Sequence, residues 1–178
     1  MKKLSLLIAL FAFSFNVAHA KEWKEIRIGV EGAYPPFSKT EEDGSITGFD
    51  IDIANALCTE LEAKCTLVKQ DWDGIIPALL GRKFDAIIAT MDITEERQKK
   101  VAFTNKYQHI PARFVAKKGV AYEATEAFME GKKIGVQRAT TMDLYISDNF
   151  PSAKIKRYGS ADEAYLDLKA GRLDYVMA

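Results

Sequence analysis

The sequence has few of the residues that catalytic and metal sites usually require. It contains only 2 histidines and 2 cysteines in 178 residues. One of the histidines, His19, lies in an N-terminal segment that we expect to be removed, which leaves His109. No Ser-His-Asp or Cys-His pair is therefore plausible, there is no Gly-rich phosphate loop, and a zinc ligand set is lacking. We expect no catalytic residue, no metal and no cofactor.

The chain also lacks an excess of positive charge. Its 25 Lys and Arg residues balance 25 Asp and Glu residues. Residues 1–20 hold Lys2 and Lys3 and no acidic residue, so the remainder is slightly acidic. Because nucleic-acid-binding proteins usually carry a basic excess, we expect no nucleic-acid partner.

The N-terminal segment has the features of a secretory signal peptide. Two lysines precede an apolar run from Leu4 to Val17, and Ala18-His19-Ala20 fits a small-x-small cleavage site. The alternative, a membrane anchor, is less favoured because the run is shorter than the roughly 20 residues of a membrane span. We predict that residues 1–20 are a cleaved signal peptide.

Export makes a disulfide the expected state of Cys58 and Cys65, because the compartment is oxidising. Cys58 lies late in a predicted helix and Cys65 at the start of the next strand. The closed loop is short, so the expected stabilisation is about 2–3 kcal/mol. Two buried free thiols are the alternative.

Short apolar strands alternate with amphipathic helices, a pattern typical of an α/β fold with parallel sheets and right-handed crossovers. A turn-rich stretch at 32–48 predicts a hairpin or wide loop with its tip at Asp43-Gly44, and residues 104–112 predict a crossover between two lobes. The first half predicts strands at 26–30, 66–69 and 85–89, a helix from Phe49 or Asp50, and a helix at 75–80. The second half predicts strands at 112–117, 133–137, 154–158 and 174–178, and helices at 123–130, 141–148 and 161–170.

Residues 73–89 and 162–178 read as the same module twice, without a gap. Each copy opens with an Asp that can cap a helix, breaks at a glycine and ends in an apolar strand. The first copy continues into a polar loop, residues 90–97, that ends in a cation. The repeat predicts a two-lobed protein.

In open α/β sheets, ligands bind beyond the carboxyl ends of the strands. The residues at those ends are Glu31–Tyr34, Gln70–Trp72, Thr90–Asp92 and Gln137–Thr141. Helices that start at this edge offer unpaired N–H groups that suit a carboxylate. Thr140 or Thr141 can also cap a helix, a role that requires no ligand.

Several side chains near these ends favour binding of a small charged molecule. Arg97 could hold a carboxylate through two parallel hydrogen bonds, or be a solvated cation on a helix. Tyr34 and Trp72 could sandwich a ligand, and a cation over such rings gains about 0.5–2 kcal/mol; core packing is their ordinary role. Glu31 and Asp92 would favour a cationic ligand, or be ordinary exposed carboxylates.

Four segments in the same order resemble the polar amino-acid solute-binding proteins of bacterial ABC importers. They are GVEGAYPPF at 29–37, GFDID at 48–52, WDGIIPAL at 72–79 and DITEER at 92–97. The pattern is most similar to the lysine/arginine/ornithine-binding, arginine-binding and histidine-binding members, and covers the whole chain after the signal peptide. The resemblance implies a monomeric, non-catalytic protein of the periplasm that captures a cationic L-amino acid and delivers it to a membrane permease.

The resemblance also implies the two-lobed periplasmic-binding-protein (type II) fold. Lobe 1, in its N-terminal part, would comprise residues 21–109, and lobe 2 residues 110–178. Members of the family continue past the point that corresponds to Ala178, where an acidic residue would pair with the ligand's α-ammonium group. We therefore expect lobe 2 and the return to lobe 1 to be incomplete in this chain.

The roles of individual residues follow from the same resemblance. Tyr34 and Trp72 would stack on the ligand side chain, and Arg97 would hold the α-carboxylate with help from backbone N–H groups near Asp92 and Thr141. The cysteine pair matches the family's disulfide. The complete expected ligand set is Glu31, Tyr34, Trp72, Ala89, Thr90, Asp92, Arg97, Gln137, Thr140 and Thr141.

The choice of ligand stays open because the chain departs from the family pattern. Ala89, Thr90 and Asp92 stand where the lysine/arginine/ornithine type has a serine-rich loop, and Asp92 is closer to the arginine type. Gln137 replaces an apolar residue of that type. Arginine, lysine, ornithine, histidine and opine-like compounds remain candidates.

Two other functions use the same fold. A periplasmic dehydratase of the cyclohexadienyl type would need a substrate with a ring and a carboxylate, with Glu31 and Asp92 as acids. The sensor domain of a receptor would be followed by a transmembrane segment.

Overall fold

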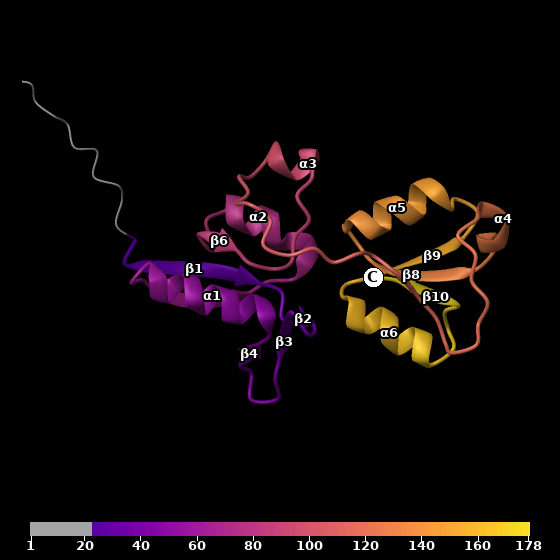
Figure 1. Ribbon diagram of the computed structural model, residues 1–178, viewed down its shortest axis with the longest axis horizontal. Helices are drawn as coiled ribbons and strands as arrows, with labels where there is room; N and C mark the ends of the chain where they lie inside the picture. The colour runs from indigo at the N-terminus through magenta and orange to yellow at the C-terminus, as the bar shows by residue number, and fades with distance from the viewer. Residues whose placement is uncertain (1–22) are drawn as a thin grey trace, which may run out of the picture.

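The computed structural model describes residues 23–178, which form two α/β lobes joined by an extended segment (Figure 1). The expected signal peptide, residues 1–20, lies outside the described residues. Within 23–178, no helix combines the length and the apolar character needed to cross a membrane. The two-lobed α/β class expected from the sequence is thus observed.

Lobe 1 is built on a parallel three-stranded sheet in the order β5-β1-β6. Alternate residues of β1 face opposite sides, because side chains along a strand alternate. Ile28 and Val30 pack against helix α1, whereas Gly29 faces Phe84, whose ring would lie 2.5 Å from a Cβ at that position. The elements of this lobe are β1 (Glu25–Val30), α1 (Phe49–Glu60), β5 (Lys64–Lys69), the 3₁₀ helix η1 (Trp72–Gly74), α2 (Ile75–Leu80), β6 (Ala86–Ile87) and α3 (Glu95–Gln98).

A small antiparallel sheet extends from lobe 1. It is formed by the part of the chain that connects β1 to α1. Its strands are β2 (Ala33–Tyr34), β3 (Ser38–Thr40) and β4 (Ile46–Thr47). Gly44 lies at the tip with φ +84°, and the Asp43 carboxylate accepts a hydrogen bond of 2.9 Å from the Ser45 N–H. The predicted hairpin tip is confirmed.

Lobe 2 is built on a four-stranded sheet in the order β7-β10-β8-β9. Helix α5 packs on one face through Ile146, and α6 packs on the other through Ala164 and Leu168, so the sheet lies between the two helices (Figure 1). The elements are β7 (Phe114–Val115), α4 (Glu126–Met129), β8 (Lys133–Gln137), α5 (Thr141–Asn149), β9 (Lys154–Tyr158), α6 (Ala161–Lys169) and β10 (Tyr175–Met177).

The repeated modules take equivalent places in the two lobes. In the first copy, α2 leads into β6, which pairs in parallel with β1. In the second copy, α6 leads into β10, which pairs in parallel with β8. Each module therefore adds a helix and a parallel strand beside an earlier strand of its lobe, β1 or β8.

Some elements differ from the sequence-based expectation. Strand β7 runs antiparallel to β10, because the chain enters it from the extended segment without a crossover helix. The expected strands at 85–89 and 112–117 and the helix at 123–130 are shorter. The expected polar loop at 90–97 contains the short helix α3, which starts because the Thr94 hydroxyl accepts a hydrogen bond of 3.2 Å from the Arg97 N–H.

The disulfide between Cys58 and Cys65 is present and ties the end of α1 to the start of β5. The disulfide expected from the sequence is therefore confirmed, and the alternative of two free thiols is wrong. Residues 102–113 form neither a helix nor a strand, as expected for a crossover between the lobes.

Candidate functional site

A cavity of about 90 Å³ lies between the two lobes at the carboxyl ends of β1 and β8. Every residue expected to contact a ligand lines it. Sequence reasoning missed Ile110 and Ala112 from the crossover, Met142 from α5 and Ala178 after β10, because apolar side chains in these places carry no signal of their own. The complete lining is Glu31, Tyr34, Trp72, Ala89, Thr90, Asp92, Arg97, Ile110, Ala112, Gln137, Thr140, Thr141, Met142 and Ala178.

Glu31 directly follows β1 and is buried, with 5% of its surface exposed. Burial raises the pKa of its carboxyl group to about 7, and a hydrogen bond from Gln137 offsets part of this increase. Gln137 ends β8 in the other lobe, and its Nε2 donates both to Glu31 and, at 3.1 Å, to the Gly159 carbonyl. The glutamate and the glutamine thus join the two lobes at the cavity wall.

Arg97 lies on α3 with its guanidinium 5.2 Å from the centre of the Trp72 ring. Its Nη1 donates to the Asp92 carbonyl at 2.8 Å, and its Nη2 donates to the Ala139 carbonyl of lobe 2 at 3.3 Å. Burial lowers the pKa of the guanidinium, although the group remains a cation at neutral pH. The guanidinium therefore lies in the cavity wall, supported by an aromatic ring, as a donor group for an anion.

The turn between β8 and α5 makes several contacts with lobe 1. Ala139 has a φ of +59°, and its carbonyl also accepts a hydrogen bond of 3.1 Å from Trp72 Nε1. Arg138 lies 3.4 Å from the Asp73 carboxylate. We call residues 138–141 the docking turn, because their backbone and side chains meet lobe 1.

The two threonines of the docking turn differ in their contacts. The Thr140 hydroxyl accepts from the Asp143 N–H at 3.1 Å and donates to the Gln137 carbonyl at 2.8 Å. It caps α5, as the alternative to ligand contact predicted. The Thr141 hydroxyl instead donates to the Asp92 carboxylate across the space between the lobes.

Thr90 lines the cavity, but its hydroxyl points into lobe 1. It donates to Asp50 Oδ2 at 2.6 Å and accepts from Gln108 Nε2 at 2.8 Å. Asp50 is fully buried, and burial raises the pKa of its carboxyl group. Sequence reasoning missed Asp50, because an acidic residue in the GFDID segment indicates only the start of a helix.

Tyr34 lies on β2 with its ring 5.3 Å from that of Phe37. Burial raises the pKa of its hydroxyl group. The ring and that of Trp72 both line the cavity, so two aromatic surfaces from lobe 1 face it.

Two larger hollows, of about 430 and 620 Å³, flank the crossover. The first is lined by residues 90–94 and 103–110 with Thr141, and the second mainly by lobe 2. Neither contains Arg97 or Glu31. The smaller cavity combines the guanidinium, both acids and the aromatic rings, and is the candidate site.

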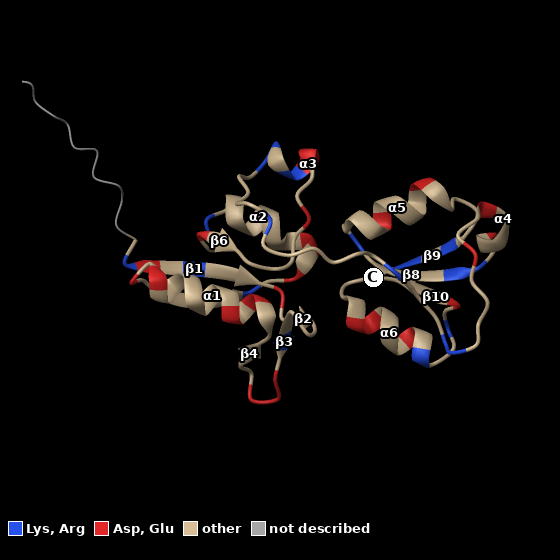
Figure 2. Cartoon of the chain, viewed as in Figure 1, with Lys and Arg blue, Asp and Glu red and all other residues tan. Residues whose placement is uncertain are grey.

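Outside the cavity, the charged residues of the described part of the chain are distributed over both lobes. Figure 2 shows acidic residues at the hairpin tip and along α1 and α6, and basic residues along β8 and β9, spread over both lobes. No group of three or more His, Cys, Asp or Glu side chains in residues 23–178 is arranged to hold a metal ion.

Comparisons with known proteins identify the family of the chain. Residues 26–133 match the family described as bacterial extracellular solute-binding proteins, family 3. The L-arginine-binding protein of Pseudomonas aeruginosa is 49% identical over 180 residues, which cover 100% of this chain and 70% of that protein. The lysine/arginine/ornithine-binding periplasmic protein of Escherichia coli is 38% identical, with 98% of this chain and 67% of the relative covered.

Solved structures match as well. The arginine-bound form of truncated ArgBP from T. maritima is 36% identical with a TM-score of 0.80, covering 87% of this chain and 73% of that one. The ancestral amino-acid-binding protein AncCDT-1, described as a precursor of cyclohexadienyl dehydratase, is also 36% identical with a TM-score of 0.82, over 87% and 70% of the two chains. These curated relatives are binding proteins and not enzymes. The chain belongs to family 3 of the bacterial extracellular solute-binding proteins.

Proposed function

We propose that the chain is the substrate-binding component of an ABC amino-acid importer. It captures a cationic L-amino acid between its lobes in the periplasm and delivers it to the membrane permease. One observation carries the proposal: a single cavity, lined from both lobes, combines a guanidinium, two carboxylates and two aromatic rings. A free amino acid with a cationic side chain presents groups that complement each of these.

Arg97 binds the α-carboxylate of the ligand in this proposal. A guanidinium presents N–H groups in a fork that matches a carboxylate. The Trp72 ring and the Asp92 carbonyl support its orientation. Backbone N–H groups near Asp92 and at the start of α5 by Thr141 add donors, since the first N–H groups of a helix have no partner within it.

Glu31, Gln137 and the aromatic rings receive the side chain of the ligand. The carboxylate of Glu31 offers an acceptor to a guanidinium or ammonium group, and the faces of Tyr34 and Trp72 attract a cation. Asp92 and the loop from Ala89 to Thr90 contact the α-amino group and the adjacent part of the ligand. Arginine is favoured among arginine, lysine, ornithine and histidine, because several relatives are described as arginine-binding proteins.

Capture depends on the two lobes meeting around the ligand. A ligand that contacts both lobes stabilises the closed arrangement by its differential affinity for that state. We propose that the protein is a monomer in which residues 21–109 form the N-terminal part of lobe 1 and residues 110–178 form part of lobe 2. Residues 1–20 act as a cleaved signal peptide.

Isothermal titration of the purified protein with arginine, lysine, ornithine and histidine tests this function, with glutamate as the control of opposite side-chain charge. We expect arginine to give a saturable heat and glutamate to give none. Heats for the cationic amino acids no larger than the glutamate heat would rule the proposal out.

A further inference from the structure

We propose that Asp50 is a positioning residue that fixes the cavity loop at Thr90 and the lobe-1 end of the crossover with one buried carboxylate. Movement between the lobes is then confined to residues 109–112. The proposal concerns residues that do not touch the ligand through their side chains, and only its binding readout rests on the proposed function.

Asp50 lies in the first turn of α1 and has 0% of its surface exposed. Its Oδ2 accepts from the Thr90 hydroxyl at 2.6 Å, and its Oδ1 accepts from the Tyr107 hydroxyl at 2.9 Å and from Gln108 Nε2 at 3.5 Å. These neighbours are uncharged, so neutral donors and the N-terminus of α1 compensate for burial of the carboxylate. One side chain on α1 thus holds two segments that lie 40 and 57 residues further along the chain.

The neighbours of Asp50 also bond to one another. Gln108 Nε2 donates to Thr90 Oγ1 at 2.8 Å, and the Thr90 N–H donates to the Tyr107 hydroxyl at 3.1 Å. Thr90 has a φ of +49°, a backbone conformation that is unfavourable for a β-branched residue. Such a conformation persists only where the surroundings fix it, and this hydrogen-bond network does so.

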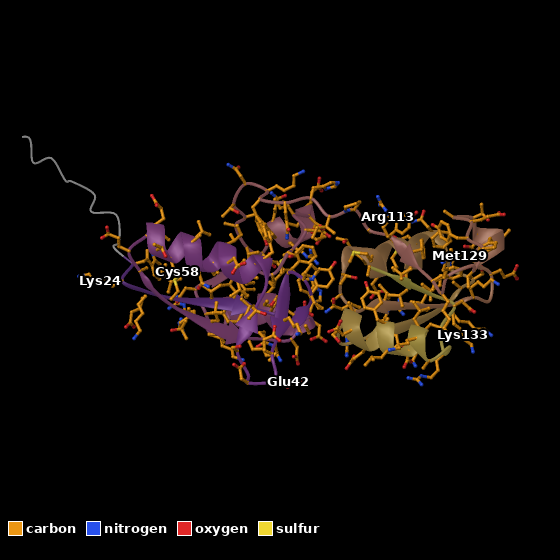
Figure 3. The ribbon with its side chains drawn as sticks, turned by 60° about the horizontal axis from the view of Figure 1, so that its bottom comes forward. Lys24, Glu42, Cys58, Arg113, Met129 and Lys133 are labelled. Atoms are coloured by element: carbon orange, nitrogen blue, oxygen red, sulfur yellow. A yellow bond between two sulfur atoms is a disulfide. The ribbon has the colours of Figure 1, made fainter. Side chains whose placement is uncertain are left out.

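The network also sets where the crossover can bend. Tyr107 and Gln108 are held to lobe 1 by Asp50. Arg113 is held to lobe 2, because its N–H and C=O pair with Ala178 at 2.7 and 3.0 Å. Figure 3 labels Arg113 at the junction of the two lobes. The segment between the anchors, residues 109–112, forms neither helix nor strand and contributes two residues to the cavity wall.

The consequence for binding is that the cavity loop is ordered before the ligand arrives. If the network is broken, the ligand has to bind a protein in which the competent arrangement of the loop is only partly populated. The apparent Kd then rises as the inverse of the fraction that keeps the competent arrangement.

Tyr107→Phe tests the proposal most directly, because it removes one hydroxyl from the network and leaves the ring. Tyr122→Phe is the matched control: its ring is exposed to a similar degree, 47% against 44%, and it lies in lobe 2. Amide hydrogen exchange at Thr90 is measured by NMR in the ligand-free protein. We expect exchange about five to ten times faster in Tyr107→Phe, the size expected for the loss of one hydrogen bond, and no change in Tyr122→Phe.

Arginine affinity of the same variants and of Asp50→Asn supplies the second readout, taken well below each melting temperature. We expect Kd to rise about fivefold or more in Tyr107→Phe and Asp50→Asn, whereas a purely structural role would lower the melting temperature and leave Kd unchanged. The proposal is overturned if the Thr90 amide exchanges in Tyr107→Phe at the same rate as in the wild type. This outcome decides the matter even if Asp50→Asn fails to fold. A wild-type protein that binds no amino acid defeats the proposed function, while the exchange measurement still decides the role of the network.

Discussion

Gln137 Nε2 donates a hydrogen bond to the Glu31 carboxylate across the two lobes, although the residues lie 106 positions apart in the chain. Each stands at the carboxyl end of the strand that pairs in parallel with the repeated module of its lobe, β1 or β8. The contact therefore links the equivalent points of the two sheets. It also places a titratable group where both the stability of the protein and the charge of the cavity depend on it.

The stability of the protein is expected to fall as pH rises from about 4.5 to about 7 through the contribution of Glu31. Its folded-state pKa of about 7 lies above the ordinary value, so the folded state binds more protons in this window and loses stability as they dissociate. Urea unfolding across this pH range measures the effect. Glu31→Gln is expected to remove this part of the slope, and Glu130→Gln, at an exposed site in lobe 2, is expected to leave it.

Arginine binding is expected to release a proton near pH 6.5. A cation beside Glu31 favours the ionised carboxylate and lowers its pKa, so a group that is largely protonated in the free protein loses its proton in the complex. Titration in buffers with different ionisation enthalpies measures the release. An unchanged heat across these buffers in the wild type would contradict the placement of the cationic end at Glu31.

Replacement of Arg97 by alanine is expected to weaken arginine binding about 10- to 100-fold, because a charged hydrogen-bonded partner of the carboxylate is lost. Arg97→Lys keeps the charge but not the planar fork, and is expected to recover only part of the affinity. Calorimetry measures both. Lys100→Ala, a change at a nearby cation, serves as the control, and an equal loss there would point to a general effect of charge.

Arg138→Ala in the docking turn is expected to reduce affinity by only about two- to fivefold. The guanidinium and the Asp73 carboxylate are both about half exposed, and exposed ion pairs contribute about 0–1 kcal/mol. The loss is expected to shrink in high salt. Arg157→Ala removes an ion pair that lies wholly within lobe 2 and is expected to leave the affinity unchanged; equal effects of the two substitutions would exclude a role of the turn in closure.

Replacement of both Cys58 and Cys65 by serine is expected to lower the free energy of unfolding by about 2–3 kcal/mol, because the short loop is no longer closed in the unfolded chain. Urea unfolding under non-reducing conditions measures this. The cavity lies at the other end of β1 from the bridge, so arginine affinity at low temperature is expected to stay the same.

The ligand-cavity residues could be predicted because strand ends are visible in the sequence. Glu31 and Gln137 each follow an apolar strand, and the topology of parallel strands brings such ends to one edge. Asp50 could not be predicted to hold Thr90. That contact depends on the left-handed backbone of Thr90 and on the path of the crossover, and neither leaves a pattern in the residues themselves.

The direction of β7 and the contacts of Arg97 could not be predicted from the sequence either. Strand periodicity identifies a strand but not its orientation, and the segment before β7 lacks the helix that enforces parallel pairing. The spacing left Arg97 as either a carboxylate-binding group or a solvated cation, and its place at the cavity was expected from the family resemblance. Its bond to the Ala139 carbonyl depends on a positive φ at an alanine, which propensity does not predict.

The Ala139 carbonyl accepts a hydrogen bond from Arg97 and so competes for this guanidinium with the ligand carboxylate of the proposed function. It accepts from both Arg97 and Trp72, so an oxygen of the chain itself occupies a donor that we assign to the ligand's carboxylate. This oxygen is tethered, and its effective concentration is set by the separation of the lobes and not by the surroundings. In the proposed function, a ligand carboxylate has to displace this oxygen from Arg97, so the contact lowers the apparent affinity for every anionic ligand by the same factor.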